Sequence, residues 1–282
     1  MPVGIVIATR NRVAELLLTL ERLVALPERP DVVVADNCST DGTVPAVRAA
    51  FPSVSVLDLP VNMGAAARNL GACLLQTPVI AFNDDDSHWA PGALGRAAAL
   101  FDARPRLGLV AGRVLVGHDE RLDPTCAVMA SSPLRSLPGA PGPAVLGFVA
   151  CGAIVRRDAF LAAGGFEARL GVGGEETLLA VDLAAAGWEL AYVYDVVTHH
   201  HPAGDGARPG RRVREVRNAL WSTWLRRPAG PAVLGTARAV GQGFSDRSAA
   251  RGVVEAFGGL RWTLRERRAV PADVAAAMAA LD

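Results

Sequence analysis

The sequence predicts an α/β fold in which a mainly parallel sheet is flanked by helices and followed by a C-terminal helical extension. Three observations support this prediction: strands and helices alternate through the first ninety or so residues, polar residues follow the strands, and the apolar pattern is helical after about residue 208. Such alternation is typical of parallel strands joined by right-handed crossovers. We therefore expect a nucleotide-binding domain at residues 1–207 and the extension at 208–282.

Short apolar runs in the N-terminal third predict four strands, at residues 3–8, 31–35, 54–59 and 79–84. Helical patterns lie between them: the first has Leu16, Leu20, Leu23 and Val24 on one face, and the others span residues 43–50 and 65–75. In a parallel sheet these strand ends meet at one edge, where ligands bind. Thr9, Asp36, Asn62 and Asp84 each follow a strand, so we expect them to share one cleft.

The remainder of the chain predicts a less regular succession of elements. Helices are expected at 91–103, 158–163 and 175–186, and strands at 107–116, 145–155 and 188–193. Residues 118–143 are rich in Pro, Ser and Gly without periodicity, which indicates an irregular insertion. The tail predicts helices at 211–227, 232–240 and 250–265, then a short alanine-rich helix.

Composition excludes some classes of function. The 282 residues carry a formal net charge of +1, so nucleic acid is not an expected partner. The four widely spaced cysteines, Cys38, Cys73, Cys126 and Cys151, form no C-x-x-C pair and are expected to be buried or incidental thiols in a reducing compartment. The longest apolar run, residues 144–155, is too short to cross a bilayer, and no basic leader is evident. The expected location is cytoplasmic.

Three consecutive carboxylates, Asp84, Asp85 and Asp86, follow the apolar run that begins at Val79. Like charges at a strand end repel one another and lose solvation unless a cation or solvent relieves them. Mg²⁺ takes oxygen ligands and is often shared between carboxylates and a substrate's phosphates. The run therefore predicts a metal–diphosphate site. The alternative is a solvated acidic turn before the helix that begins near Pro91.

Several segments occur in a characteristic order along residues 3 to about 205. They are Thr9-Arg10-Asn11-Arg12, Asp36-Asn37-Cys38-Ser39-Thr40-Asp41-Gly42, Asn62-Met63-Gly64-Ala65-Ala66-Ala67-Arg68-Asn69, Phe82-Asn83-Asp84-Asp85-Asp86, and Gly164-Gly165-Phe166 with Gly174-Glu175-Glu176. Together they resemble the family 2 glycosyltransferases of the GT-A fold. The resemblance implies a GT-A-type, Rossmann-like mixed sheet and transfer of a sugar from a nucleoside-diphosphate sugar.

The resemblance assigns the nucleotide sugar to the early strand ends. Thr9 and Asp36 take the positions that contact the base, where a carboxylate can accept from a pyrimidine imide N–H. The alternative for Asp36 is an Asx turn with Ser39. Arg68 either neutralises diphosphate, pairs with the acidic cluster or is a surface arginine. The other implied contacts of the nucleotide sugar are Arg10, Asn62, Gly64, Asp84 and Asp85.

The resemblance also implies a divalent cation, Mn²⁺ or Mg²⁺. Asp84 is expected on the ribose side and Asp86 on the metal, with Asp85 assisting either. A late histidine ligand would come from His199-His200-His201, which favours Mn²⁺ because imidazole fits Mg²⁺ poorly. We favour His200, with His201 as the neighbour that could equally serve. The alternative is a solvated turn before Pro202.

The implied reaction needs a general base for the acceptor hydroxyl. Glu176 matches the second acidic residue of the family's pair and is the expected base, with Glu175 next. The pair here is Glu-Glu where many members have Glu-Asp, so the choice between the two stays open. Both carboxylates would also suit a helix N-terminus. Trp89 is either a residue of the acceptor side or a core tryptophan.

The predicted activity is metal-dependent, inverting glycosyl transfer by single displacement, from a UDP-, dTDP- or GDP-linked sugar to an acceptor hydroxyl on a glycan, a lipid-linked molecule or a small molecule. One alternative is a sugar-nucleotide-forming nucleotidyltransferase, although Thr9-Arg10-Asn11-Arg12 lacks the glycine of a triphosphate loop. The other is an inactive sugar-nucleotide or glycan-binding module. The basic helix from Arg211 to Arg227 either docks on the catalytic domain or contacts the inner face of the membrane, and a homodimer is left open.

Overall fold

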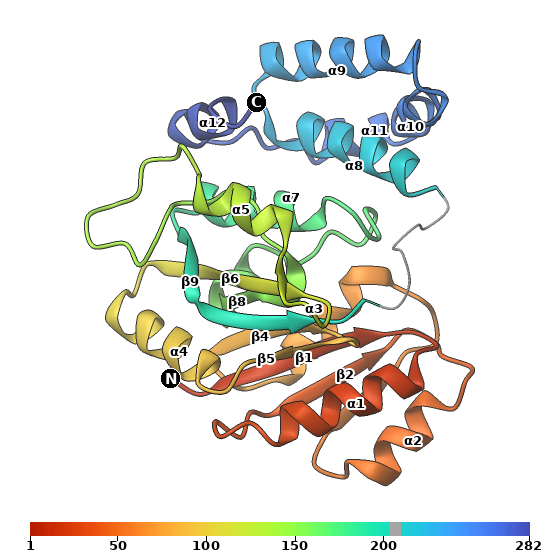
Figure 1. Ribbon diagram of the computed structural model, residues 1–282. Coiled ribbons are helices and arrows are strands. Elements are labelled where there is room, and N and C mark those ends of the chain that lie inside the picture. Colours follow the sequence, from red (N-terminus) through yellow and green to blue (C-terminus); the bar gives the residue numbers. More distant parts are fainter. Residues whose placement is uncertain (203–209) are drawn as a thin grey trace.

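The computed structural model describes residues 1–202 and 210–282, and it consists of a curled sheet between helices with a further layer of C-terminal helices (Figure 1). The predicted boundary between residues 207 and 208, and the predicted end of the family resemblance near 205, lie outside the described residues. Among the residues described, no helix is long and apolar enough to cross a membrane.

The N-terminal half is the predicted parallel layer. Its strands are β1 (Val3–Thr9), β2 (Val32–Asp36), β3 (Ser55–Asp58) and β4 (Val79–Asp84), in the order β3-β2-β1-β4, and every pair is parallel. The connecting helices are α1 (Val13–Val24), α2 (Thr43–Ala50), the 3₁₀ turn η1 (Gly64–Ala66) and α3 (Ala67–Leu74). Thr9 pairs with Asp36, and Ala8 pairs with Asp84. The register therefore brings these three strand ends to one edge, as predicted.

The rest of the sheet is mixed. β4 pairs antiparallel with β8 (Ala153–Arg156), which pairs antiparallel with β6 (Leu107–Val116). β6 pairs parallel with β9 (Glu189–His200), and β9 pairs antiparallel with β5 (Ser87–Trp89). β5 follows β4 in the chain after a short turn, yet it lies at the other end of the strand order. The sheet therefore curls so that the aspartate turn faces the end of β9.

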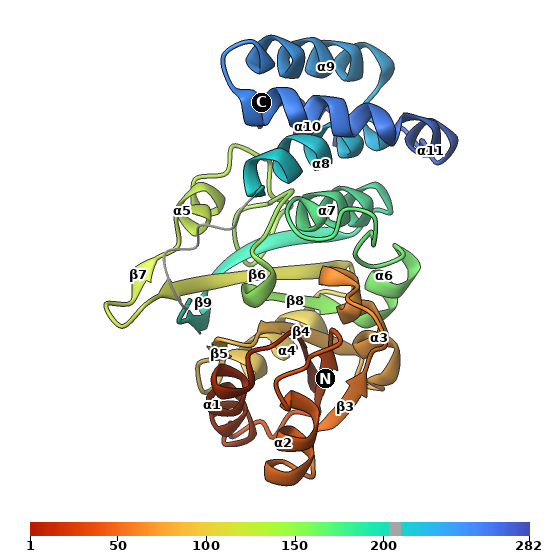
Figure 2. The same ribbon diagram turned by 90° about the vertical axis from the view of Figure 1, so that its right-hand side faces the viewer.

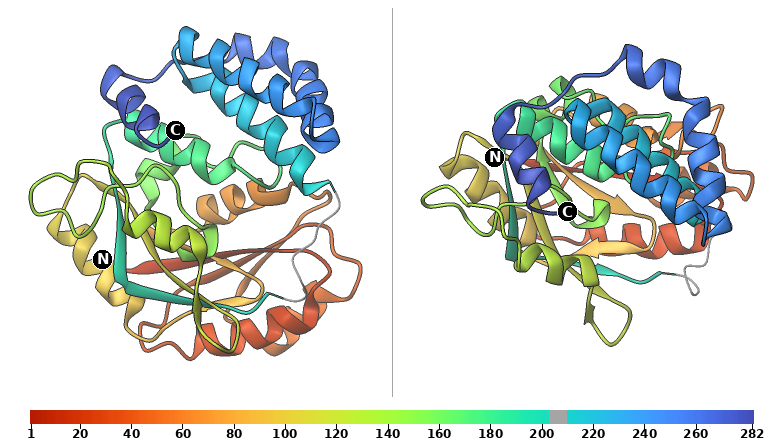
Figure 3. Two further views of the ribbon diagram at one scale, coloured as in Figure 1. Left: turned by 45° about the horizontal axis from the view of Figure 1, so that its top comes forward. Right: turned by 90° about the horizontal axis from the view of Figure 1, so that it is seen from above.

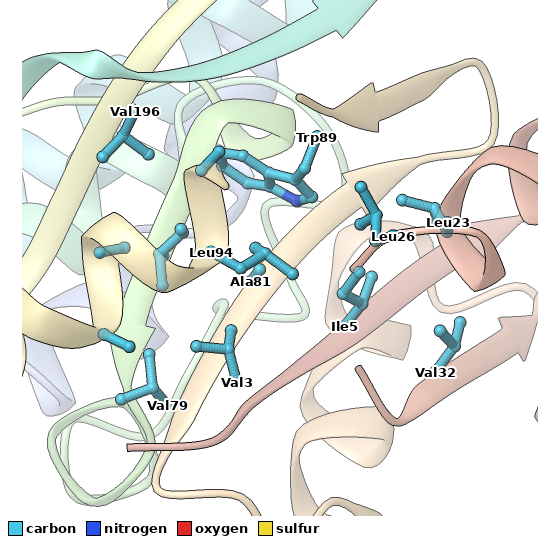
Figure 4. Packing of buried hydrophobic residues seen from close by; sticks show 14 of the residues in the cluster. Val3, Ile5, Leu23, Leu26, Val32, Val79, Ala81, Trp89, Leu94 and Val196 are labelled. Carbon is cyan, nitrogen blue, oxygen red and sulfur yellow. The ribbon is translucent and has the colours of Figure 1, made fainter. Parts of the chain in front are cut away.

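Each face of the sheet has its own apolar core. Ile5 and Ile7 of β1 pack with α1 and α4 (Ala93–Ala103), whereas Val6 packs in the cluster that includes residues of α3, α6 (Arg157–Ala162) and α7 (Glu175–Ala185). This division follows from the alternation of side chains along a strand. Trp89 is fully buried in the first cluster, beside Leu94 and Ala81 (Figure 4), which makes it a core residue and not a wall of the acceptor site.

Two predictions in the middle of the chain are wrong. The strand expected at 145–155 is a strand only from Ala153, after a 3₁₀ turn η2 (Ala150–Gly152). A Cβ at Gly152 would lie 2.6 Å from the Val114 side chain, so this chain segment approaches β6 too closely for a regular strand. The insertion at 118–143 contains β7 (Arg121–Leu122) and the helix α5 (Pro124–Ala130). Asp123 caps α5 by accepting from the Thr125 N–H at 2.7 Å.

The strand expected at 188–193 is longer than predicted. β9 continues to His200 past an irregularity opposite Gly112 and Arg113, and Tyr194 is exposed there. β5, its partner, was not expected at all, because a three-residue strand has too few side chains to display a period. The histidine run therefore lies largely on a strand, not in a solvated turn.

The C-terminal part is helical, as predicted. It comprises α8 (Arg211–Arg226), α9 (Ala229–Gly243), α10 (Arg247–Gly258), α11 (Leu260–Arg265) and α12 (Ala272–Ala279), and Figure 3 shows these blue helices beyond α7. The single helix expected at 250–265 is broken at Gly259, where a Cβ would lie 2.5 Å from Trp221 Nε1. The apolar face of α8 packs against Leu170 and Leu178. Docking of this helix on the preceding domain, the favoured alternative, is thus confirmed.

Candidate active site

The ends of β1 and β4 are joined by a buried side-chain hydrogen bond. Thr9 Oγ1 donates to Asp85 Oδ2 at 2.8 Å, and Thr19 of α1 donates to the Asp85 carbonyl at 2.9 Å. Burial raises the pKa of Asp85 to about 6, although Arg12 and Thr9 both oppose this shift. Asp85, the aspartate without a secure predicted role, therefore fixes the turn between β4 and β5 to the end of β1.

Arg12, which sequence reasoning did not single out, neutralises this turn. Its Nη2 lies 2.9 Å from Asp86 Oδ2, and its Nε lies 3.2 Å from Asp85 Oδ1. Burial opposes ionisation of Asp86, but His200 and Arg12 together hold the pKa of that carboxyl below its usual value. Arg10, the predicted contact in the same segment, is exposed. The only signal for Arg12 was its place at the start of α1, beside the strand end.

The pairing of β5 with β9 decides which histidine faces the aspartates. His200 pairs with Ser87, and its Nε2 lies 3.2 Å from Asp86 Oδ1. Because side chains alternate along a strand, His199 and His201 lie on the other face. Both stack on His88, with ring centroids 5.0 and 5.5 Å apart. The structure thus brings His200 to the predicted metal site and carries His201 away from it.

Three potential metal ligands converge beside the aspartate turn. Oxygen, sulfur and nitrogen atoms of Asp84, Cys151 and His200 lie within 4.8 Å of one another. Carboxylate and imidazole are suitable ligands for Mn²⁺, and Cys151 adds a softer sulfur. Asp86 adjoins this group through His200, so the predicted donors fit a divalent cation. Cys151 was expected to be a buried or incidental thiol, and it is buried, but no pattern in the sequence indicated its position beside the aspartates.

Arg68 lies at the inner wall of the cleft. It is buried, and its Nη2 pairs with Asp84 Oδ1 at 2.5 Å, while its Nε has no partner among the described residues. Of the three alternatives, pairing with the acidic cluster is therefore the one observed. The guanidinium also retains a donor that could reach an anion bound in front of Asp84.

Asp36 makes the Asx-type turn that was the alternative prediction and leaves its second carboxylate oxygen unpaired. Its Oδ2 accepts from the Ser39 N–H at 2.8 Å, which is the Asx-type turn. Its Oδ1 is buried and has no partner within the described chain. A buried acceptor without a donor is costly unless a ligand supplies one. This oxygen is thus free for a base N–H.

Asn62 and Gly64 shape a turn that contacts the loop before α7. The Asn62 Oδ1 accepts from the Gly64 N–H at 2.9 Å, and Gly64 has a φ of +60°. A Cβ at Gly64 would lie 3.2 Å from the Gly171 carbonyl oxygen, and the Ala65 N–H donates to that same oxygen at 3.2 Å. The Asn62 side chain therefore stabilises the turn itself, and the Ala65 backbone joins the turn to the glycine-rich loop.

The acidic pair opens α7 directly after Gly174, whose φ of +92° ends that loop. The Glu175 carboxylate is buried and accepts from the Gly173 N–H. Burial, and then the Glu175 charge, raise the pKa of Glu176 to about 8. Arg68 and Asp84 also influence Glu176, in opposite directions. The pair therefore belongs electrostatically to the same cleft as the aspartates.

Asn218 of α8 holds the loop that carries the acidic pair. Its side chain is fully buried and donates to the Leu170 carbonyl at 2.9 Å and the Gly173 carbonyl at 2.6 Å. Its oxygen accepts from Arg217 Nε at 3.0 Å, and Arg217 Nη2 donates to the Leu170 carbonyl at 3.2 Å. The sequence alone indicated no role for Arg217 or Asn218.

Comparisons with known proteins agree with this geometry. The family model described as glycosyl transferase family 2 matches residues 4–162. The chain is 29% identical over 231 residues to the N-acetylglucosaminyl-diphospho-decaprenol L-rhamnosyltransferase of Mycobacterium tuberculosis, covering 67% of this chain and 74% of that one.

Solved structures show the same fold at low identity. The mannosyltransferase PcManGT from Pyrobaculum calidifontis, in complex with GDP-Man and Mn²⁺, has a TM-score of 0.59 at 21% identity, covering 99% of this chain and 74% of that one. S. aureus TarS 1–349 in complex with UDP-GlcNAc has a TM-score of 0.64 at 17% identity, covering 98% and 84%.

Proposed function

Because the chain belongs to glycosyl transferase family 2 and has the GT-A fold, we propose that it transfers a sugar from a UDP-, dTDP- or GDP-linked donor to an acceptor hydroxyl with inversion. The observation that carries this proposal is the acidic pair at the start of α7. The pKa of Glu176 is raised to about 8, close to the pH at which the enzyme would work. A general base is most effective when its pKa lies near the operating pH.

The nucleoside diphosphate would lie along the ends of β1, β2 and β4. The free buried oxygen of Asp36 supports a hydrogen bond from an imide N–H of the base. Thr9 is engaged with Asp85, so its contribution is the position of the strand end rather than a free hydroxyl. The unpartnered Nε of Arg68 supports binding of a diphosphate oxygen.

A divalent cation would be held by residues around His200, with Asp84 and Asp86 as the carboxylate donors and Cys151 within reach. When bound, the cation would offset the negative charge that develops on the departing diphosphate. Mn²⁺ is present in the PcManGT complex. The imidazole and thiol of this site favour Mn²⁺ over Mg²⁺, which prefers oxygen ligands.

The transfer itself is a single displacement. Glu176 takes the proton of the acceptor hydroxyl while that oxygen forms its bond to the anomeric carbon. The bond from the anomeric carbon to the diphosphate oxygen breaks, and nucleoside diphosphate leaves with the electron pair. Glu175, fixed by the Gly173 N–H, orients the start of α7 and raises the basicity of its neighbour.

The acceptor is proposed from the curated relative. That enzyme is named for an N-acetylglucosaminyl-diphospho-decaprenol acceptor. We therefore propose a hydroxyl of a glycan that is carried on a polyprenyl diphosphate lipid.

The test is release of nucleoside diphosphate from a panel of sugar nucleotides with Mn²⁺. We expect one donor to be consumed, and the matching nucleoside diphosphate with Mn²⁺ to raise the melting temperature. Asp86→Ala should remove the metal-dependent part of that rise. Glu176→Gln should keep the rise and lower kcat by about 10²–10⁴-fold, which is the usual contribution of a general base.

Each outcome bears on a separate part of the proposal. No release of nucleoside diphosphate from any donor, together with an unchanged melting temperature, would contradict both glycosyl transfer and binding of a nucleotide sugar. Binding without release would favour the inactive binding module. Full activity of Glu176→Gln would move the base to Glu175.

A further inference from the structure

The outer C-terminal helices expose a set of large apolar side chains. The exposed fractions of Val233, Phe244 and Val254 are 71%, 90% and 72%. Together with Leu234 and Val240 they are the exposed apolar side chains that we term the outer apolar face. It lies on α9 and α10, at the end of the molecule away from β1 and β2 (Figures 1 and 2). Contiguous exposed apolar surface usually marks an interaction site.

The composition of α9 makes its exposure unusual. Arg238 is its one charged residue among 15, and Ala232 is its one buried residue. Val233, Val240 and Phe244 recur at spacings of seven and four, so they lie along one stripe of the helix. An apolar helix that buries a single alanine is not stabilised by core packing of that stripe. The exposed apolar side chains of α9 are therefore available to pack against a binding partner.

The helix α8, for which membrane contact was the alternative to docking, does not provide this surface. The apolar residues of α8, which include Leu220, Trp221 and Trp224, are buried in a cluster with Leu170 and Leu178. α9 packs on α8 and α10 and leaves its far side uncovered. The surface available to a partner is therefore one helix further from the catalytic layer than the sequence suggested.

Exposed arginines lie on the same helices or next to them, Arg238 on α9, Arg247 at the start of α10 and Arg261 on α11. Arg238, Arg247 and Arg261 are exposed and have no ion pair within the described part of the chain. The acidic groups nearby are engaged, because Asp246 pairs with Arg212 and Glu255 with Arg251. An apolar stripe accompanied by uncompensated arginines is complementary to anionic lipid headgroups above an acyl layer.

We propose that the outer apolar face binds the surface of an anionic lipid bilayer, with its apolar side chains at the boundary between headgroups and acyl chains. The proposal rests on the proposed function, since a polyprenyl-linked acceptor resides in such a bilayer. A second copy of the chain is less suitable, because a two-fold interface would place the same arginines opposite one another.

The experiment is sedimentation of the full chain with vesicles of phosphatidylcholine alone or mixed with phosphatidylglycerol. We expect binding to the anionic vesicles and weakening by added salt. Val233→Ser with Phe244→Ser should lower the partition coefficient by about tenfold or more, because two apolar side chains no longer enter the lipid. Arg238→Glu with Arg261→Glu should abolish the preference for the anionic vesicles.

Leu18→Ser is the matched control, since Leu18 is 60% exposed on α1, outside the face. This variant should bind vesicles like the unchanged chain. Equal loss in the control, or no binding to anionic vesicles, would overturn the proposal. So would a dimer in solution that the Val233→Ser, Phe244→Ser variant dissociates.

Failure of this inference can be distinguished from failure of the proposed function. Binding of nucleoside diphosphate with Mn²⁺ involves the cleft of β1, β2 and β4 and should be unchanged in every surface variant. Loss of vesicle binding with nucleotide binding intact overturns only the membrane surface. A chain that binds vesicles and releases no nucleoside diphosphate contradicts the proposed activity instead.

Discussion

At the scale of single residues, the two adjacent glutamates differ because their surroundings differ. Glu175 is buried and accepts from the Gly173 N–H. Glu176 lies beside the Glu175 charge. Burial and that charge together raise the pKa of Glu176 to about 8. Such a carboxylate is a stronger base than an ordinary glutamate. In the proposed reaction, the Glu175 charge therefore increases the basicity of Glu176.

This arrangement predicts a pH profile. A base acts when deprotonated, so kcat/KM should rise with pH through an apparent pKa of about 8 in the unchanged chain. Glu175→Gln removes a charge that raises the pKa of Glu176, so the rise should move to lower pH. The measurement is kcat/KM across pH 5.5–9.5, roughly the range that brackets both profiles. An unmoved profile would show that the titrating group is not Glu176.

At the scale of elements, the loop from Leu170 to Gly174 depends on α8 for its position. A cavity of about 250 Å³ lies behind it, lined by Gly173 and Gly174 and extending between α7 and α8 to Met278. Packing on that side is therefore incomplete, and the hydrogen bonds from Asn218 to the Leu170 and Gly173 carbonyls fix the loop. Gly173 in turn donates to Glu175. Asn218 is thus a positioning residue for the acidic pair.

Asn218→Ala tests this role. The variant leaves the Gly173 carbonyl without its donor and the Leu170 carbonyl with the Arg217 donor alone. We expect kcat to fall by about tenfold to a hundredfold, in line with losses from a displaced catalytic group. The affinity for nucleoside diphosphate with Mn²⁺ should change little, because that site lies at the ends of β1, β2 and β4. Asn218→Asp, which cannot donate, should behave like the alanine variant.

Ser222→Ala is the control for the same helix, because Ser222 lines the cavity and, among the described residues, donates to neither the Leu170 nor the Gly173 carbonyl. It should retain the unchanged kcat. If Asn218→Ala instead weakens nucleotide binding as much as it lowers kcat, the effect is general loss of structure and the positioning role is refuted.

Long periodic elements were predictable because their own side chains specify them. The strands at 3–8 and 79–84 and the helix at 43–50 agree with β1, β4 and α2 to within a residue. The elements that were missed depend on tertiary contacts. β5 exists through its pairing with β9. The apolar run at 145–155 is buried without forming a continuous strand, since Gly152 must pass close to Val114. A buried segment and a buried strand both appear in the sequence as a short apolar run, so the run alone does not distinguish them.

The same distinction holds for the site. The sequence predicted that Asp36 and Asp84 share one edge, because strand ends in a parallel sheet converge whatever the details of packing, whereas His200 was expected there only from the family resemblance. Contacts that depend on how distant segments pack together could not be predicted from the sequence. Cys151 reaches the Asp84 carboxylate from η2, and Asn218 reaches the loop from a helix that follows in the chain. His201 was excluded only by the register of β5 on β9.

At the scale of the whole molecule, the C-terminal helices and the preceding domain share apolar clusters. Leu170 and Leu178 pack with Leu220 and Trp224, and Val181 packs with Val274 of α12. Arg226 adds a two-pronged ion pair to Asp182 of α7. α7 therefore carries the acidic pair at its start and supports the C-terminal helices along its length. A change in the packing of those helices would therefore also affect the loop from Leu170 to Gly174.

We expect this shared core to make unfolding cooperative. Leu220 is 3% exposed, and Leu220→Ala should cost about 2–5 kcal/mol, the usual range for a buried leucine. Tryptophan fluorescence reports mainly on Trp221, Trp224 and Trp262 of the helices, together with Trp89 and Trp188, whereas far-ultraviolet circular dichroism reports on the entire chain. Both melting curves should shift together, since the lost contacts belong to both parts.

Val128→Ala gives the reference for that experiment, because Val128 is largely exposed on α5 and should change stability by less than about 0.5 kcal/mol. Two separate transitions, of which Leu220→Ala shifts only the fluorescence one, would mean that the helices unfold alone. In that case the C-terminal helices would not stabilise the loop that carries the acidic pair. The fall in kcat expected for Asn218→Ala would then come only from the lost hydrogen bonds to that loop. A single shifted transition instead means that the C-terminal helices, the loop and the acidic pair are parts of one cooperative unit.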